Sequence, residues 1–190
     1  MKNFLTTYIA KQKQTLDTIP VEKVAEIVSL FKTALDNDQQ IFVFGNGGSA
    51  ANASHFITDL GKGSSDKTYK RFRCLSINDN TPWITALGND YAFDEIFVRQ
   101  LNNFAKPGDL VFVMSVSGNS PNLVKAACWA KENDIRVIAL LGANKGKLAD
   151  IADIPVIVQD VHYGRVEDAH MGICHMIAYA FMELPDLQKK

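Results

Sequence analysis

The apolar positions of this 190-residue chain follow two different patterns. Over residues 1–38 they recur at helical spacing, and Pro20, which suits the first turn of a helix, divides this stretch into two predicted helices. After residue 39 they gather into short continuous runs, a pattern typical of strands buried on both faces. We expect strands at residues 41–44, 110–114, 135–141 and 154–158, and a weaker one at 73–77.

Helical patterns separate these strands. We expect helices at residues 49–60, 94–104, 121–133 and 165–182. Strands that alternate with helices form parallel βαβ units, so the prediction is an α/β three-layer sandwich with a central parallel sheet and two extra N-terminal helices. The length suits one domain, residues 1–190, in which 1–38 form the N-terminal helices and 39–190 the α/β core. Ligands of such sheets bind beyond the carboxyl ends of the strands.

Composition narrows the classes of function. Apolar residues make up 47% and charged residues 22% of the chain, and 20 basic against 21 acidic side chains give a net charge of −1. This balance argues against nucleic acid as the main partner. The longest apolar runs fall far short of the roughly 18 residues that span a membrane, and the N-terminus lacks a signal-peptide pattern. Three widely spaced cysteines suit a reducing compartment, so we expect a cytoplasmic protein.

The loop after the first predicted strand is rich in glycine. It reads GNGGSA over residues 45–50 and runs directly into a predicted helix. Glycines let the backbone approach an anion, Ser49 can cap the helix, and the start of a helix favours negative charge. A tight turn from strand to helix explains the same residues equally well.

A serine-rich loop follows the strand at residues 110–114. It reads SVSGNSP over residues 115–121, and its proline suits the first turn of the next helix. Three serines can surround a phosphate with hydroxyl and amide donors and need no lysine, whereas a helix cap explains one or two serines only. Two such loops at one edge of a sheet favour a phosphorylated small ligand.

Two helices carry candidate acid–base and metal-binding residues. His55 and Asp59 are four apart, which places them on one helix face, although a hydrogen bond within the helix is an alternative. The last helix is apolar nearly all round, which predicts burial. Its polar beginning and first turns carry Arg165, Glu167, Asp168, His170 and His175. For any single histidine here, a backbone carbonyl is the simpler partner.

Four phrases of the sequence together resemble a known family. FGNGGSA, ALGNDYAF, KPGDLVFVMSVSGNSPN and GKLADIADIPVIV are similar to the sugar isomerase (SIS) domain family, most of all to its phosphoheptose isomerase branch. The resemblance covers nearly the whole chain and implies a flavodoxin-like fold and a homotetramer with sites between subunits. The implied reaction converts sedoheptulose 7-phosphate to D-glycero-D-manno-heptose 7-phosphate, often with bound zinc. The implied pathway supplies heptose for lipopolysaccharide, capsule or surface-layer glycans.

The resemblance also implies roles for individual residues. One divalent metal ion, expected to be zinc, would be held by His55, Asp59, Glu167 and His175. The implied acid–base residues are Asp59, Glu167 and His175. The implied substrate contacts are Asn46, Gly47, Gly48, Ser49, Asn89, Asp90, Ser115, Val116, Ser117 and Ser120, together with Asp59 and Glu167. From the sequence alone, Asn89 and Asp90 suit a turn that ends a helix.

The chain departs from the family pattern at three positions. Asp59 stands where the family has glutamate, Glu167 where it has glutamine, and Gly164 where typical members have aspartate. Two histidines and two carboxylates make a more anionic site, which suits zinc but also manganese, iron or cobalt. Because Asp59 is one methylene shorter than glutamate, we hypothesise that Glu167 takes over part of the acid–base work.

The sequence leaves several alternatives open. Eight residues of helix rise about 12 Å, so Glu167 and His175 share one ion only if their side chains converge, and His170 is a reserve ligand. Arg165 could contact the substrate or pair with Asp168. The alternative functions are a non-catalytic SIS-domain protein, such as a replication-initiator-associating factor or a phosphosugar sensor, and an isomerase of another sugar phosphate. The retained histidines and carboxylates favour an enzyme.

Overall fold

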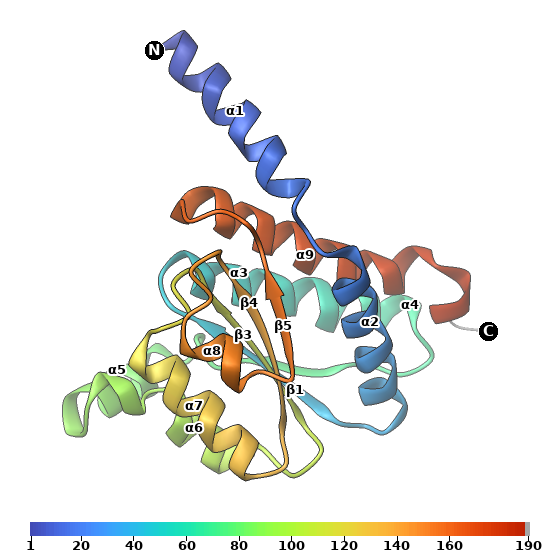
Figure 1. The fold of residues 1–190 in the computed structure, drawn as a ribbon. Coiled ribbons are helices and arrows are strands. Elements are labelled where there is room, and N and C mark those ends of the chain that lie inside the picture. The colour runs from blue at the N-terminus through green and yellow to red at the C-terminus, as the bar shows by residue number, and fades with distance from the viewer. Residues whose placement is uncertain (189–190) are drawn as a thin grey trace.

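A five-stranded sheet with helices on both faces forms the centre of the structure, a computed structural model that describes residues 1–188 (Figure 1). The strands are β1 (Gln40–Gly45), β2 (Arg73–Ser76), β3 (Leu110–Ser115), β4 (Arg136–Leu141) and β5 (Ile154–Ile157). Neighbours pair in parallel in the order β2-β1-β3-β4-β5. The predicted α/β fold with a central parallel sheet is confirmed, and its strand order is the flavodoxin-like one.

The apolar strands fill two cores because successive side chains of a strand point to opposite faces. Val43 and Phe112 pack on the face covered by α2, α3 and α9, whereas Phe42 and Val111 pack on the face covered by α6 and α7. The helices on the first face are α2 (Val21–Asp36), α3 (Gly48–Thr58), α4 (Ser65–Lys67) and α9 (Tyr163–Glu183), and those on the second include α6 (Val98–Phe104) and α7 (Pro121–Glu132). Continuous apolar runs therefore correspond to strands covered on both sides.

The apolar pattern misses the short helix α4, two longer helices and the start of another helix. Helices α5 (Thr81–Asp90) and α8 (Lys147–Ile151) lie where the sequence predicts no element. The helix expected at 94–104 is a 3₁₀ turn followed by α6. The start of α5 depends on a cap, since the Asn80 side chain accepts a hydrogen bond from the Trp83 amide at 3.1 Å.

The helical segment that begins with α3 changes its geometry at a predicted site residue. A π-helical turn, Asp59–Ser64, directly continues α3. A Cβ atom at Gly61 would lie 3.0 Å from Cys74 Sγ, so glycine lets this wider turn pack closely on β2. Such turns are frequent at functional sites, and this one begins at Asp59.

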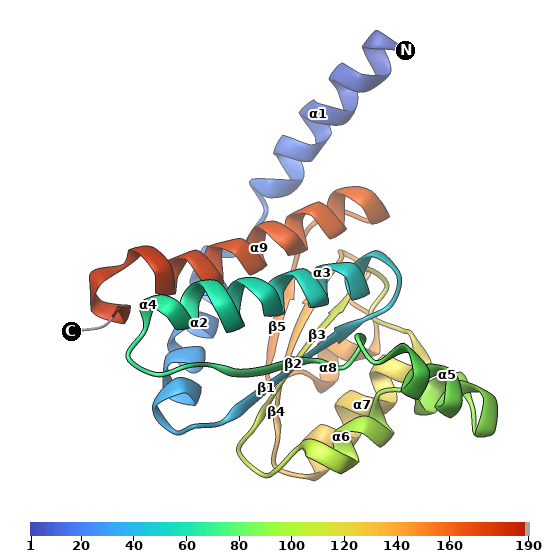
Figure 2. The same ribbon diagram turned by 180° about the vertical axis from the view of Figure 1, so that it is seen from behind.

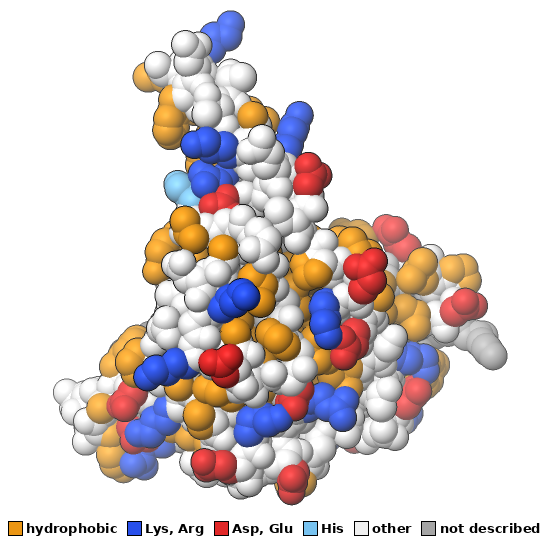
Figure 3. Space-filling model, viewed as in Figure 1, with side chains coloured by type: hydrophobic (Ala, Val, Ile, Leu, Met, Phe, Trp, Pro, Cys, Tyr) orange, Lys and Arg blue, Asp and Glu red, His pale blue; other side chains and the backbone are white. Residues whose placement is uncertain are grey.

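Helix α1 (Lys2–Leu16) projects from the rest of the chain (Figures 1 and 3). Its side chains Phe4, Leu5 and Ile9 are exposed, while its second half contacts α9. Gln12 Nε2, for example, donates to the Arg165 carbonyl at 3.2 Å. None of the helices within residues 1–188 is long and apolar enough to cross a membrane.

The Asp160 carboxylate ties α1 to the start of α9. It accepts hydrogen bonds from Arg165 Nε at 2.6 Å and Nη2 at 2.9 Å, from the Thr15 hydroxyl, and from the two backbone amides that follow it. Arg165 thus pairs with Asp160, which neither of the sequence-based alternatives anticipates. These bonds, led by those of Arg165, hold the pKa of Asp160 well below its usual range.

We predict that Asp160→Asn destabilises the protein in a pH-dependent way. The lowered pKa means that the carboxylate stabilises the fold fully above pH about 4, the pKa of an unpaired aspartate, and loses this effect as the pH falls. The expected loss at pH 7 is roughly 2 kcal/mol. Urea unfolding at pH 7, 5 and 3 measures it, with the exposed Asp168→Asn as the matched control. A loss independent of pH, or an equal loss in the control, contradicts the prediction.

Candidate active site

Helices α3 and α9 lie side by side and run in the same direction over one face of the sheet (Figure 2). Residues successively further along α3 contact residues successively further along α9. Asn52 Nδ2 donates to the Glu167 carbonyl at 2.9 Å, and further along the rings of His55 and His175 lie 5.2 Å apart. Both helices begin at the carboxyl edge of the sheet, where ligands of such folds bind.

The two predicted phosphate loops border one cavity of about 70 Å³ at the start of these helices. Its lining residues are Asn46, Ser49, Met114, Ser115, Val116, Ser117, Ser120, Leu123, Tyr163 and Glu167. The side-chain amides of Asn46 and Asn122 bond each other at 2.9 Å and so hold the two loops together. The structure therefore brings the predicted residues of both loops to one place.

The first turn of α3 is open to an anion. Gly47 precedes the helix in the left-handed region, with φ +56°, and no side chain of the described residues caps it. The prediction that Ser49 caps the helix is wrong, because Ser49 is already the second residue of α3 and its side chain is buried at the cavity. The amides of Ser49 and Ala50 donate to the carbonyls of Asn46 and Gly47, each at 3.0 Å, so an anion at the start of α3 would share these donors or use the Gly48 amide.

The serine-rich loop is shaped by a close approach between backbones. Gly118 has φ +66°, and a Cβ atom there would lie 1.9 Å from the Lys145 carbonyl oxygen. The Ser115 hydroxyl accepts the Gly118 amide at 3.0 Å, so this serine shapes the loop. Ser117 before the glycine and Ser120 after it line the same cavity.

Three of the predicted metal ligands meet further along α3 and α9. His55 Nε2 lies 3.4 Å and His175 Nε2 lies 3.6 Å from the same oxygen, Asp59 Oδ2. One ligand atom from each residue lies within 4.8 Å of the other two. Two imidazole nitrogens and a carboxylate oxygen fit a divalent metal ion such as zinc. The two imidazole side chains are 54% and 43% exposed, so the cluster is open on one side.

Glu167 lies with the phosphate loops and not with this cluster. A Cβ atom at Gly48 would lie 2.3–2.6 Å from its carboxylate group, which therefore rests on the first turn of α3. Eight residues separate Glu167 from His175, about 12 Å along the helix axis. Burial, helped by the charge of Asp168, raises the pKa of Glu167. Its roles as metal ligand and acid–base residue stay predictions.

The other predicted residues lie away from both groups. His170 is fully buried, and neither ring nitrogen has a hydrogen-bond partner among the described residues. Burial lowers the pKa of His170 to about 4. The Leu141 backbone acts in the opposite direction, but its effect is smaller. His170 is a core residue outside the metal-binding cluster, so its reserve role is not supported. Asn89 and Asp90 end α5, exposed and bonded to each other at 2.9 Å, and their substrate role stays a prediction.

Sequence reasoning missed two polar residues at the cavity and its edge. Tyr163 begins α9 and lines the cavity with a side chain that is 62% exposed. Asn122 lies in the first turn of α7 and holds Asn46. Asn122 directly follows the serine-rich loop, which is a usable signal, whereas nothing in the sequence distinguishes Tyr163.

Gly164 has a structural reason in this chain. A Cβ atom there would lie 2.9 Å from the Tyr8 hydroxyl oxygen of α1. The Tyr8 ring packs edge-on against His162, with centroids 5.7 Å apart. A side chain at position 164 would displace the Tyr8 hydroxyl group, so Gly164 allows this contact between α1 and α9.

Known proteins resemble this chain over nearly its whole length. The sequence pattern of the SIS domain family matches residues 6–142. The chain belongs to the SIS domain family. This SIS-domain protein is 38% identical over 168 residues to a probable phosphoheptose isomerase of Thermoplasma volcanium, covering 88% of this chain and 83% of that protein. It is 36% identical over 176 residues to a phosphoheptose isomerase of Geotalea daltonii, with 91% of each covered.

A solved structure extends the likeness to the fold. The structure of phosphoheptose isomerase from Neisseria gonorrhoeae matches this SIS-domain protein with a TM-score of 0.85 at 31% identity. The match covers 95% of this chain and 97% of that one. The family resemblance predicted from four short phrases is confirmed.

We predict that Gly118→Ala destabilises the protein by roughly 2–4 kcal/mol, because the left-handed backbone and the contact with Lys145 both oppose a side chain. Binding of inorganic phosphate should weaken with it. Thermal unfolding and a phosphate titration measure the two effects. Gly88→Ala is the matched control, since a Cβ atom there meets nothing within 4 Å and φ is ordinary. Similar stability of the two variants contradicts the prediction.

Proposed function

We propose that this protein is a phosphoheptose isomerase that converts sedoheptulose 7-phosphate to D-glycero-D-manno-heptose 7-phosphate. The observation that carries the proposal is the pairing, on two parallel helices, of a phosphate cavity with a His–Asp–His cluster. Ser49 at the cavity and His55 in the cluster are six residues apart, about 9 Å along α3. This spacing suits a long sugar phosphate whose carbonyl end lies at the cluster. The relatives named phosphoheptose isomerase support the substrate.

The phosphate end would be bound by hydroxyls and amides. Ser49, Ser117 and Ser120 line the cavity, and α3 and α7 both begin beside it. We assign Glu167 a binding role at this end in place of the acid–base work hypothesised from the sequence, since its carboxylate rests on the start of α3. The raised pKa increases the protonated fraction of Glu167 at a given pH, and the protonated form can donate a hydrogen bond to the ligand where the carboxylate would repel phosphate.

The carbonyl end would hold the chemistry. Conversion of a ketose to an aldose removes a proton from C1, forms an enediol, and returns a proton to C2. Asp59 Oδ1 has no hydrogen-bond partner among residues 1–188, so we propose that this oxygen takes and returns the proton. His55, His175 and the other oxygen of Asp59 would hold a divalent metal ion, proposed to be zinc. When bound, such an ion polarises the carbonyl group as a Lewis acid.

Assembly would close the open side of the cluster. The exposed apolar face of α1 continues into a hollow of about 420 Å³ lined by Leu16, Ile19, Val21 and Met176, and Met176 adjoins His175. Apolar surface of this kind suits a contact between copies. We therefore propose a cytoplasmic homotetramer with sites between subunits, in which residues 1–190 form one SIS domain. Heptose synthesis for surface glycans is the proposed pathway.

We predict that the purified protein with added zinc converts sedoheptulose 7-phosphate, followed by NMR, and that a chelator lowers the rate. Asp59→Asn should lower kcat by about 10²–10⁴-fold because it removes the proton acceptor. Asp59→Glu, which restores the family residue, should retain activity within about tenfold of the wild type. Failure of the wild type with zinc, manganese and cobalt counts against the proposal. Turnover of only shorter sugar phosphates would point to a different substrate.

We predict that Glu167→Gln changes KM and leaves kcat within about threefold. As the pH rises through the raised pKa of Glu167, the wild type gains a negative charge beside the phosphate and its KM should rise, whereas the variant has no such charge. The ratio of the two KM values between pH 5 and 8 measures this. The charge of Asp168 contributes to the raised pKa of Glu167, so in Asp168→Asn the KM should begin to rise at a lower pH than in the wild type. A fall in kcat of a hundredfold or more would instead show that Glu167 transfers protons.

A further inference from the structure

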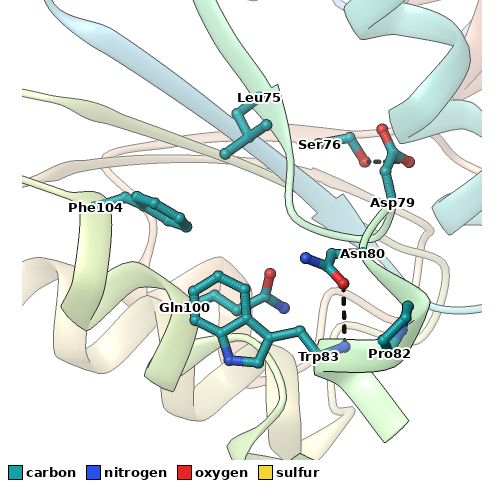
Figure 4. A pocket seen from close by; sticks show the side chains of 8 residues that line it. All are labelled: Leu75, Ser76, Asp79, Asn80, Pro82, Trp83, Gln100 and Phe104. Carbon is teal, nitrogen blue, oxygen red and sulfur yellow. Dashed lines mark hydrogen bonds between the residues drawn. The ribbon is translucent and has the colours of Figure 1, made fainter.

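We propose that this protein has a second ligand site, a cavity at the free edge of the sheet that binds a flat, uncharged heteroaromatic ring with the hydrogen-bonding edge of a nucleobase (Figure 4). The cavity measures about 420 Å³ and lies between β2, α5 and α6. It is lined by Leu75, Ser76, Asp79, Asn80, Pro82, Trp83, Gln100 and Phe104. This volume is usual for small-molecule sites, and the inference does not depend on the proposed function.

Aromatic and aliphatic side chains form the walls of the cavity. The rings of Trp83 and Phe104 meet edge to face, with centroids 5.4 Å apart and planes at 70°. Leu75 lies across from them (Figure 4). A flat ring can stack on one aromatic face while its edge meets the other, which favours a planar ligand over a sugar.

Gln100 supplies a fixed acceptor in the cavity. Its side chain is 2% exposed, and Nε2 donates to the carbonyls of Ile77 at 3.0 Å and Ile96 at 2.7 Å. Both amide protons are used, so the orientation of the amide group is determined. Oε1 has no hydrogen-bond partner among the described residues and faces the cavity (Figure 4). An acceptor held in this orientation can take a hydrogen bond from a donor on a ligand in the cavity.

Asn80 supplies a donor beside this acceptor. Its Oδ1 accepts the Trp83 amide at the cap of α5, so Nδ2 remains to donate into the cavity (Figure 4). Asp79 is the charged residue of the lining, and its Oδ1 already accepts the hydroxyls of Ser54 and Ser76. Its negative charge disfavours a phosphate group. A ring acceptor next to an N–H group, as on adenine, therefore matches Asn80 and Gln100 together.

Adenosine is the probe for this site. The chain has two tryptophans, so Trp129→Phe leaves Trp83 as the fluorescent reporter. We expect a saturable change in Trp83 fluorescence with adenosine, and calorimetry on the unsubstituted protein should give the same Kd. Purine riboside, which lacks the exocyclic amine, should bind about tenfold more weakly because Gln100 loses its donor.

A matched pair of variants tests the donor. Asn80→Asp keeps the capping oxygen and replaces Nδ2 with an acceptor, so adenosine should bind at least about tenfold more weakly while the melting temperature is unchanged. Asn3→Asp adds the same charge on α1 and should leave binding unchanged. Absence of saturable binding up to millimolar adenosine overturns the proposal. Equal affinity for purine riboside, or undiminished binding by Asn80→Asp, overturns it as well.

Discussion

The parallel packing of α3 on α9 is the constraint on which the site depends. Each helix contributes residues to both the phosphate cavity and the metal-binding cluster, so one relative position of the helices sets both. A slip by one turn would move one helix about 5.4 Å past the other and separate His55 from His175. The Asn52 bond to the Glu167 carbonyl and the buried apolar face of α9 oppose such a slip.

The sheet and the phosphate loops are predictable from sequence because burial on both faces leaves a local trace. Strand β3 is apolar at five successive positions and ends at the serine-rich loop, so the strand and its functional edge appear together. Helices α5 and α8 leave no such trace. They are short, and α5 begins at a side-chain cap that apolar periodicity does not register.

The site is predictable only where its geometry is local. The spacing of His55 and Asp59 fixes their common face, but the meeting with His175 requires the fold. For Glu167 the sequence gives the distance along the helix and not the direction of the side chain, which points to Gly48. Arg165 finds its partner in the loop before α9, and Gly164 is explained by Tyr8, which is remote in sequence. Contacts of this kind depend on how elements dock.

Two departures from the family pattern are explained by local structure. Asp59 reaches both histidines despite its short side chain, and it stands where α3 gives way to the π-helical turn. Gly164 leaves room for the α1 contact. Asp59 is thus accommodated by the local backbone, and Gly164 by the position of α1.

No lysine or arginine lies among the described residues that line the phosphate cavity. Hydroxyl and amide dipoles act over a few ångströms, unlike a net charge, whose field reaches about 8–10 Å at physiological ionic strength. The residues that line the cavity therefore add no positive charge that attracts an anion from a distance. They distinguish a bound anion by the shape of its phosphate group and by the hydrogen bonds that it accepts.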